Sequence, residues 1–433
     1  MAILVCRRKI VTFRKLAAIA FIFIGASVAW TILGTSVLTR TGDYNGSLDR
    51  EVQLLWGPGH RQVAPRACVQ RPTFETEIVE EKHPNGNVVR RDVKKPVTRC
   101  APVALDSTRA AVNLALEHRR KGLLWYPTYG VVFKATYTFR NPDTEQRALV
   151  VRFPLPAENA LFDDFIFQIN GVTARPEGDV AKEMSTTIMS AAGAVTTLDV
   201  QYRSRGLRTW TYAFAPEGTA EVRDFQLTMD TNFREIDFPA GAVSPNEKRE
   251  TAEGFALDWR FTNLISGQNI GMALPDKLNP GPFAARVTFF APVSLLFFLT
   301  VMVIIGATHG PSLHPMHYWF IACAFFAFHL LLAYLVDHIS VHVAFAAAAA
   351  VSLFLVFSYV RVVTGAGRAL WWAISAQLVF LILFSYAFFF EGFTGLTITI
   401  GAIVTLFVLM QVTARVSWDE IFASKEIGHA SRA

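Results

Sequence analysis

Residues Leu313–Ser340, LHPMHYWFIACAFFAFHLLLAYLVDHIS, form the most distinctive stretch of this 433-residue chain. Pro315 stands where an apolar run of membrane length begins, and Asp337 and His338 stand where it ends. An α-helix needs about 20 predominantly apolar residues to cross about 30 Å of hydrocarbon. The stretch therefore predicts a transmembrane helix.

Six windows of the chain are long and apolar enough to span a bilayer. None of them contains Asp, Glu, Lys or Arg. The predicted spans are Leu16–Leu38, Val287–Ala307, Tyr318–Val336, Ser340–Val360, Leu370–Phe390 and Phe393–Val412. The chain thus divides into a basic N-terminus (1–15), a first span (16–38), an external region (39–286), a five-span bundle (287–412) and a tail (413–433).

The distribution of Lys and Arg predicts the orientation of these spans, because both residues accumulate in cytoplasmic flanks. Five basic residues between Arg7 and Lys15 precede the first span, whereas the turns at Asp337-His338 and Glu391-Gly392 contain none. Basic residues return on the opposite side of the bundle, at Arg361, Arg368, Arg415, Lys425 and Arg432. We expect both termini in the cytoplasm, residues 39–286 outside, and the first span to stay as an uncleaved anchor because its apolar run exceeds that of a signal peptide.

The external region reads as β-rich. Apolar and polar residues alternate over 131–140, which predicts a half-buried strand, and Asn141-Pro142-Asp143 then predicts a hairpin turn into a strand at 148–155. Strands are also predicted at 198–206, at 209–214 as a partner for it, and at 225–229. Short strands with frequent turns favour a sandwich-like antiparallel fold. One helix is predicted at 107–122, with Ser107 as N-cap and Gly122 as the stop.

Cys68 and Cys100 are both external in this topology, where disulfides persist. They flank Asn85-Gly86, a strong hairpin signal, and folding the chain about that turn brings the two cysteines near each other. We therefore predict a Cys68–Cys100 disulfide. The same hairpin sets acidic residues against basic ones, namely Glu75, Glu77, Glu80 and Glu81 against Arg90, Arg91, Lys94 and Lys95.

Composition argues against a nucleic-acid-binding protein. Hydrophobic residues make up 52% of the chain and charged residues 18%, and much of the net charge of +6 flanks the spans, where topology explains it. No nucleophile–base arrangement, P-loop, zinc-protease motif or dinucleotide fingerprint occurs, so we predict no enzyme and no cofactor.

Polar residues of the bundle are the remaining candidates for chemistry. Asp337, His338 and His342 gather at the outer end of the third and fourth spans, and Glu391 lies in the last outer turn. His329 lies deeper, where an ionisable group is a functional candidate. The alternatives are a solvated turn for the outer groups and a bundle-facing hydrogen bond for His329.

Three histidines, His309, His314 and His317, crowd one inner loop, but without a Cys partner or a fixed scaffold they predict no metal site. His314-Pro315 more simply precedes a helix, because proline suits the first turn.

Leu313-His314-Pro315-Met316 followed by Asp337-His338 resembles the signature of the CreD family of bacterial inner-membrane proteins, which more often has Glu at the acidic position. Other blocks that resemble the family, in the same order, are Leu54-Leu55-Trp56-Gly57-Pro58, Arg249-Glu250, Gly254-Phe255, Trp259, Gly401 and Arg415-Val416-Ser417-Trp418. The resemblance implies one N-terminal span, a large periplasmic domain and a helical bundle. It also implies an association with envelope stress, without catalytic residues to carry over.

The expected function is therefore a non-enzymatic inner-membrane protein whose periplasmic domain senses, binds or scaffolds. The alternative is a transporter or transporter subunit that uses His329, Asp337, His338 and His342. The expected partners are the lipid bilayer and a periplasmic or membrane protein, with no nucleic acid.

Overall fold

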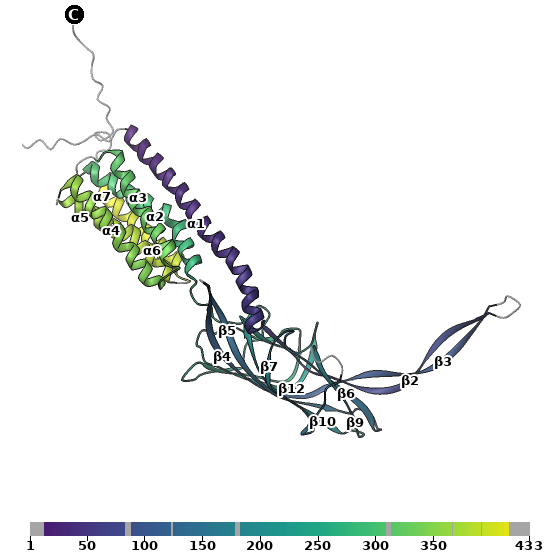
Figure 1. Ribbon diagram of the computed structural model, residues 1–433. Helices are drawn as coiled ribbons and strands as arrows, with labels where there is room; N and C mark the ends of the chain where they lie inside the picture. Colours follow the sequence, from purple (N-terminus) through teal and green to yellow (C-terminus); the bar gives the residue numbers. More distant parts are fainter. Residues whose placement is uncertain are drawn as a thin grey trace, which may run out of the picture. The chain divides into compact units, whose positions relative to one another are not determined.

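The computed structural model describes residues 13–82, 88–122, 124–177, 182–308, 313–365, 367–390 and 392–414. The chain forms two compact units: Met1–Gly46 with Leu278–Ala433, and Ser47–Lys277. The first is helical and the second is built of strands (Figure 1). One helix, α1 (Phe13–Trp56), contributes residues to both units.

Six helices or helical segments among the described residues are long and apolar enough to cross a membrane, in agreement with the six predicted spans. After α1 they are α2 (Pro280–Thr308), α3 (Pro315–Leu335), α4 (Val341–Thr364), the segment Arg368–Phe389 and α7 (Thr394–Thr413). The fifth segment is not uniform, because α5 (Arg368–Gln377) passes into a π-helical stretch, Leu378–Leu383, before α6 (Phe384–Tyr386) and a short 3₁₀ turn, Ala387–Phe389.

Aromatic side chains from α2, α3 and α4 pack together within the bundle core. Phe325 packs on Phe298 with ring centroids 4.6 Å apart, and Phe328 meets Phe345 at 5.4 Å. Large apolar side chains on α7, among them Phe407, are exposed instead. In a bilayer these side chains face hydrocarbon, so their exposure carries no cost of the kind it has in water.

The second unit contains three sheets. An eight-stranded sheet has the order β13-β14-β12-β4-β5-β10-β7-β8, a four-stranded sheet β3-β2-β6-β9, and a three-stranded sheet β1-β11-β15. In chain order the strands are β1 (His60–Val63), β2 (Arg66–Lys82), β3 (Val88–Val103), β4 (Leu105–Lys121), β5 (Leu124–Arg140), β6 (Arg147–Pro154), β7 (Phe162–Ile169), β8 (Val172–Thr173), β9 (Glu183–Ser190), β10 (Val195–Leu207), β11 (Thr209–Ala213), β12 (Ala220–Thr231), β13 (Glu247–Glu250), β14 (Phe255–Ser266) and β15 (Ile270–Ala273). One buried core joins all three sheets; the sandwich arrangement remains a prediction.

The predicted helix at 107–122 is wrong. Residues 107–121 belong to β4, which lies between β12 and β5 in the eight-stranded sheet. Burial repeats every two residues along one face of the strand, at Thr108, Ala110, Val112 and Leu114. The helix-like spacing of other residues in the segment obscures this alternation. Burial between two neighbouring strands overrides the helix propensity of the alanines.

Two predicted strand pairings are also wrong, although the strands themselves exist. β5 and β6 do not form a hairpin: β5 pairs with β4 and β10, whereas β6 pairs with β2 and β9 in another sheet. The turn at Asn141 therefore carries the chain between sheets. Likewise β11 pairs with β1 and β15 rather than with β10.

Strands β2 and β3 form a long two-stranded ribbon, which we call the β2–β3 arm (residues 70–82 and 88–100). Only Arg66–Val69 of β2 pairs with β6. Beyond them, among the described residues, the two strands pair only with each other and run out past the rest of the sheets (Figure 1). The turn predicted at Asn85-Gly86 lies outside the described residues, but the pairing of Lys82 with Val88 flanks it.

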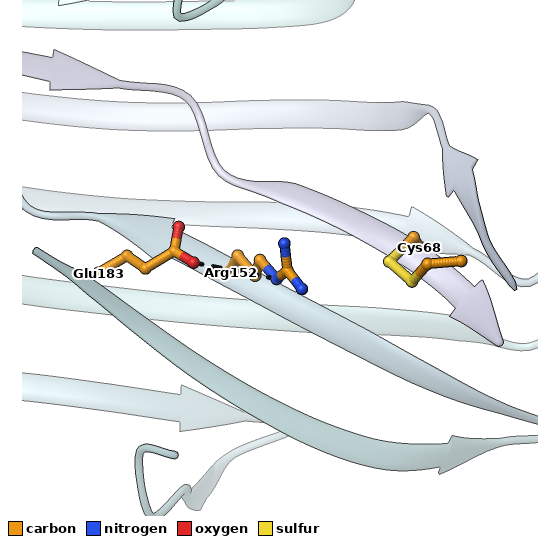
Figure 2. Close-up of a disulfide and its surroundings, with 4 residues drawn as sticks. Cys68, Arg152 and Glu183 are labelled. Carbon is orange, nitrogen blue, oxygen red and sulfur yellow. Dashed lines mark ion pairs between the residues drawn. A yellow bond between two sulfur atoms is a disulfide. The ribbon is translucent and has the colours of Figure 1, made fainter. Parts of the chain in front are cut away.

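The arm is closed at its base by the Cys68–Cys100 disulfide that the sequence predicts. Cys68 lies opposite Pro102 and Cys100 opposite Gln70, so the bond runs diagonally across the ladder. Figure 2 shows this disulfide together with an ion pair between Arg152 of β6 and Glu183 of β9 (Nε–Oε1 3.9 Å). The disulfide thus links the two strands at the point where they leave the four-stranded sheet.

Candidate functional site

An open hollow of about 300 Å³ lies on the outward face of the eight-stranded sheet. We call it the sheet hollow; it is lined by Arg109 and Ala111 of β4, Lys134 and Thr136 of β5, and Gln226 and Thr228 of β12. The strand register explains its shape. Ala111 lies between Thr228 and Lys134 in one row, and Arg109 lies between Gln226 and Thr136 in the next, so a methyl group is surrounded by longer side chains.

Neighbouring residues hold most polar groups of the sheet hollow in place. The Arg109 guanidinium donates to both carboxylate oxygens of Asp224, at 2.7 and 2.8 Å. The Thr136 hydroxyl donates to Asp199 at 2.7 Å. The Gln226 amide donates to Asp258 at 3.3 Å. The arrangement is therefore a preorganised polar surface, which suits binding better than catalysis.

Sequence reasoning missed the sheet hollow because residues 107–122 were assigned to a helix. Reading them as a strand places Arg109 and Ala111 on the outward face, in register with Lys134 and Thr136. The alternation of Thr108, Ala110 and Val112 was the available signal.

A second polar group lies inside the same unit but is closed to ligands. His60 of β1 is 1% exposed, and its Nδ1 and Nε2 lie 2.8 Å from the hydroxyls of Tyr129 and Ser204. Those hydroxyls donate onward to the carbonyls of Thr209 and Leu161, both at 2.8 Å. Burial lowers the pKa of His60 to about 4. This Ser–His–Tyr chain therefore supports the core rather than a reaction.

The Ser–His–Tyr chain has fewer side-chain protons than contacts. Four contacts link the imidazole, the two hydroxyls and the two carbonyls, whereas neutral His60, Tyr129 and Ser204 together bring three side-chain protons. One contact therefore lacks a proton when His60 is neutral. Burial opposes the protonation of His60 that would supply a fourth proton.

The polar candidates of the bundle do not come together among the described residues. Asp337, in the turn after α3, forms an ion pair with Arg40 of α1 at 2.8 Å. His338 is exposed in the turn, and His342 in the first turn of α4 stacks on Phe389 with ring centroids 4.7 Å apart. Since α4 begins at Val341, His338 and His342 do not share a helix face. Glu391 lies outside the described residues.

His329 is fully buried on α3 and contacts Trp30 of α1, with ring centroids 5.4 Å apart. Its Nδ1 donates to the Phe325 carbonyl at 2.9 Å, as expected for a bundle-facing hydrogen bond. No hydrogen-bond partner for its Nε2 occurs among the residues that the structure describes, and the same holds for Trp30 Nε1. Another buried pair, Gln377 and Ser352, links α5 to α4 at 2.9 Å.

The Leu313–Ser340 signature has a structural role at both ends of α3. His314 is the N-cap, its ring accepts from the Met316 backbone N–H at 3.3 Å, and Pro315 opens the helix. His317 contacts the Tyr359 hydroxyl at 2.7 Å, and His309 lies outside the described residues. At the other end, sequence reasoning missed Arg40, since no local pattern pairs it with Asp337.

Comparison with known proteins gives one informative match. No curated protein matches the chain. Among solved structures, a proposed nutrient-binding protein of Legionella pneumophila is 8% identical, with a TM-score of 0.34 and coverage of 61% of this chain and 84% of that one. An M1 zinc metallopeptidase of Deinococcus radiodurans is 9% identical, with a TM-score of 0.24 and coverage of 64% and 94%.

Neither structural likeness carries an argument, because both TM-scores are low. The family described as "Inner membrane protein CreD" matches residues 11–419, which include the β-rich unit and the helices of the bundle. This chain belongs to the CreD family of inner membrane proteins.

Proposed function

We propose that the chain is a non-enzymatic inner-membrane protein whose β-rich unit faces the periplasm and docks an envelope protein through the β2–β3 arm. The observation that carries the proposal is a pair of exposed apolar side chains, Phe74 and Ile78, on one face of an arm that adds little to the core of its own unit. The link to envelope stress rests on the family and is part of the proposal.

The two faces of the arm differ in character. Side chains alternate along a strand, so Phe74 and Ile78 share one face, with Lys94 between them on the partner strand. Phe74 is 70% and Ile78 63% exposed. The other face has ion pairs between Lys95 and Glu77 and, at 3.2 Å, between Arg99 and Glu75.

An isolated two-stranded ribbon is only marginally stable in water. The ion-paired face and the disulfide support the ribbon, while Phe74 and Ile78 on the other face contact solvent. Exposed apolar surface of this kind marks an interaction site. A matching partner offers an apolar cleft for Phe74 and Ile78 and a carboxylate for Lys94.

The arm's own edge argues against pairing with a second copy. Among the described residues both edges of the arm are open, and each contains a proline, Pro72 in β2 and Pro96 in β3, that lacks an N–H for a further ladder. Lys94, Lys95 and Arg99 also repel a second basic strand. A different protein is therefore the favoured occupant.

No contact among the described residues links His329, Asp337, His338 and His342 to one another, so the described part of the bundle gives the transport alternative no support.

The orientation is tested with reporter fusions to the full chain. Fusions between residues 100 and 250 are expected to report the periplasm, and fusions after residue 310 the cytoplasm, as the distribution of Lys and Arg predicts. The reverse pattern would overturn the periplasmic placement.

Docking is tested by placing a photo-crosslinking residue at Phe74 or Ile78 in the full-length protein in cells, with Glu75 on the opposite face as the matched control. We expect adducts with one envelope protein from positions 74 and 78 but not from 75. Lys94→Glu is expected to abolish them, because it opposes the partner's carboxylate.

Three outcomes contradict the proposal: no adduct from the apolar face, equal adducts from both faces, or adducts only with a second copy of this chain. If Lys94→Glu leaves the adducts unchanged, the partner offers no carboxylate to Lys94. A reduced arm with Cys68→Ser is expected to lose the adducts as well, since the disulfide holds the base of the ribbon.

A further inference from the structure

The sheet hollow borders two ionised side chains that form no ion pair among the described residues, the Lys134 ammonium in its lining and the Asp199 carboxylate on the neighbouring strand. Arg109 is neutralised by Asp224, and Asp258, which holds Gln226, forms an ion pair with Arg260 at 2.9 Å. Asp199 accepts from Thr136. No ion pair or hydrogen bond of the Lys134 ammonium occurs within the described ranges of the chain, although Lys134 lies in a row between Ala111 and Gln201.

This arrangement differs from an ordinary exposed lysine in its surroundings. Lys134 lies at the rim of a hollow whose other polar side chains are fixed and whose centre, at Ala111, is a methyl group. The volume of about 300 Å³ is at the lower end of the range for small-molecule sites. Space, a weakly polar floor and one unpaired cation therefore occur together.

We propose that the sheet hollow binds a small organic anion of the carboxylate class, with its charged group on the Lys134 ammonium and its apolar body over Ala111. Thr228 and Gln226 border the body of the ligand and set its polar specificity. This site is separate from the β2–β3 arm and is not needed for docking there.

The charge of the site selects a monoanion. A dianion such as a phosphate monoester is best held by two cations or a bidentate guanidinium. Here the only guanidinium among the lining residues, Arg109, is already occupied by Asp224, because its Nη2 donates to both carboxylate oxygens and its Nη1 to the Asp224 carbonyl. Asp199, one strand beyond Lys134 on β10, further disfavours a second negative charge.

The experiment uses full-length protein in lipid nanodiscs and fluorine NMR of para-fluorobenzoate as the probe. Line broadening is expected for this carboxylate at concentrations of about 1–10 mM, and much weaker broadening for neutral para-fluorobenzamide and for para-fluorophenyl phosphate. Lys134→Gln is expected to lower the affinity about tenfold, since a charged hydrogen bond is lost.

Two further variants separate the site from general charge effects. Ala111→Leu fills the hollow while keeping Lys134, and is expected to abolish binding. Lys182→Gln removes the same charge from an exposed position that pairs only loosely with Glu158, at 3.8 Å, and is expected to leave binding unchanged.

Binding that survives both Lys134→Gln and Ala111→Leu overturns the proposal, as does the absence of carboxylate binding by the wild type. Stronger binding of the phosphate ester or equal binding of the amide overturns the assigned ligand class. Because none of these variants touches the arm, failure here is distinguishable from failure of partner docking.

Discussion

The two units each bury a histidine, and the surroundings of the two rings differ. His60 in the β-rich unit has a hydroxyl 2.8 Å from each ring nitrogen, supplied by Tyr129 and Ser204 from strands far away in the sequence. His329 in the bundle has one bond, to a carbonyl of its own helix, and its Nε2 has no partner in the part of the chain that the structure describes.

The two folds satisfy their backbone hydrogen bonds in different ways. A β-rich unit in water gains its backbone hydrogen bonds only by bringing distant strands together, and buried polar groups are satisfied by the same long-range contacts. A membrane helix satisfies its backbone within one segment. Its side chains are not required to pair backbone groups, and among the described residues Nε2 of His329 has no hydrogen-bond partner.

The largest expected effect is a dependence of the β-rich unit on pH. Burial depresses the pKa of His60 from 6.5 to about 4, so the unfolded chain binds more protons between these values. The contribution of neutral His60 to the free energy of unfolding is fully present above about pH 6.5 and is lost as the pH falls toward 4. The loss is about 3 kcal/mol, at 1.36 kcal/mol per pKa unit.

Hydrogen exchange of β1 and β5 peptides in the full-length protein, measured from pH 7 to 4.5 with correction for intrinsic exchange rates, checks this prediction. The His60→Phe variant is the control and is expected to lose the slope in this window. Carboxylates such as Asp143, whose pKa the hydrogen bond from Arg71 lowers, contribute only at more acidic pH. If the pH dependence of exchange persists in His60→Phe, titrating groups other than His60 cause it.

A smaller loss is expected from Tyr129→Phe. Its hydroxyl accepts from the His60 backbone N–H at 3.1 Å, contacts His60 Nδ1 and donates to the Thr209 carbonyl. Removal leaves these buried groups short of a partner, at a cost of about 2 kcal/mol. Thermal unfolding followed together with hydrogen exchange measures it; Tyr334→Phe, on an exposed tyrosine of α3, is the control and should change nothing. No change in Tyr129→Phe would mean that the chain of contacts is not structural.

Sequence patterns predict the two units unequally well. Membrane spans depend on length and apolarity within one segment, so all six are found, and the Cys68–Cys100 bond follows from a local hairpin signal. Strand pairing depends on distant partners. The period of two in β4 can be interpreted only when β12 and β5 are known to flank it. The sheet hollow was missed for the same reason, because Arg109 and Lys134 meet only through that register.

The smallest expected effect is in the bundle. His329→Phe keeps the ring volume beside Trp30 and removes one hydrogen bond to a carbonyl in the middle of α3. Side-chain hydrogen bonds in membrane bundles average about 0.6 kcal/mol, so a change of at most that size is expected in the unfolding of the full-length protein in nanodiscs. His329→Ala, which opens a cavity at a fully buried site, is the contrasting variant and should cost several times more. If His329→Phe instead costs as much as Tyr129→Phe, then Nε2 has a partner in the membrane-embedded protein, and the two units satisfy their buried histidines to the same degree.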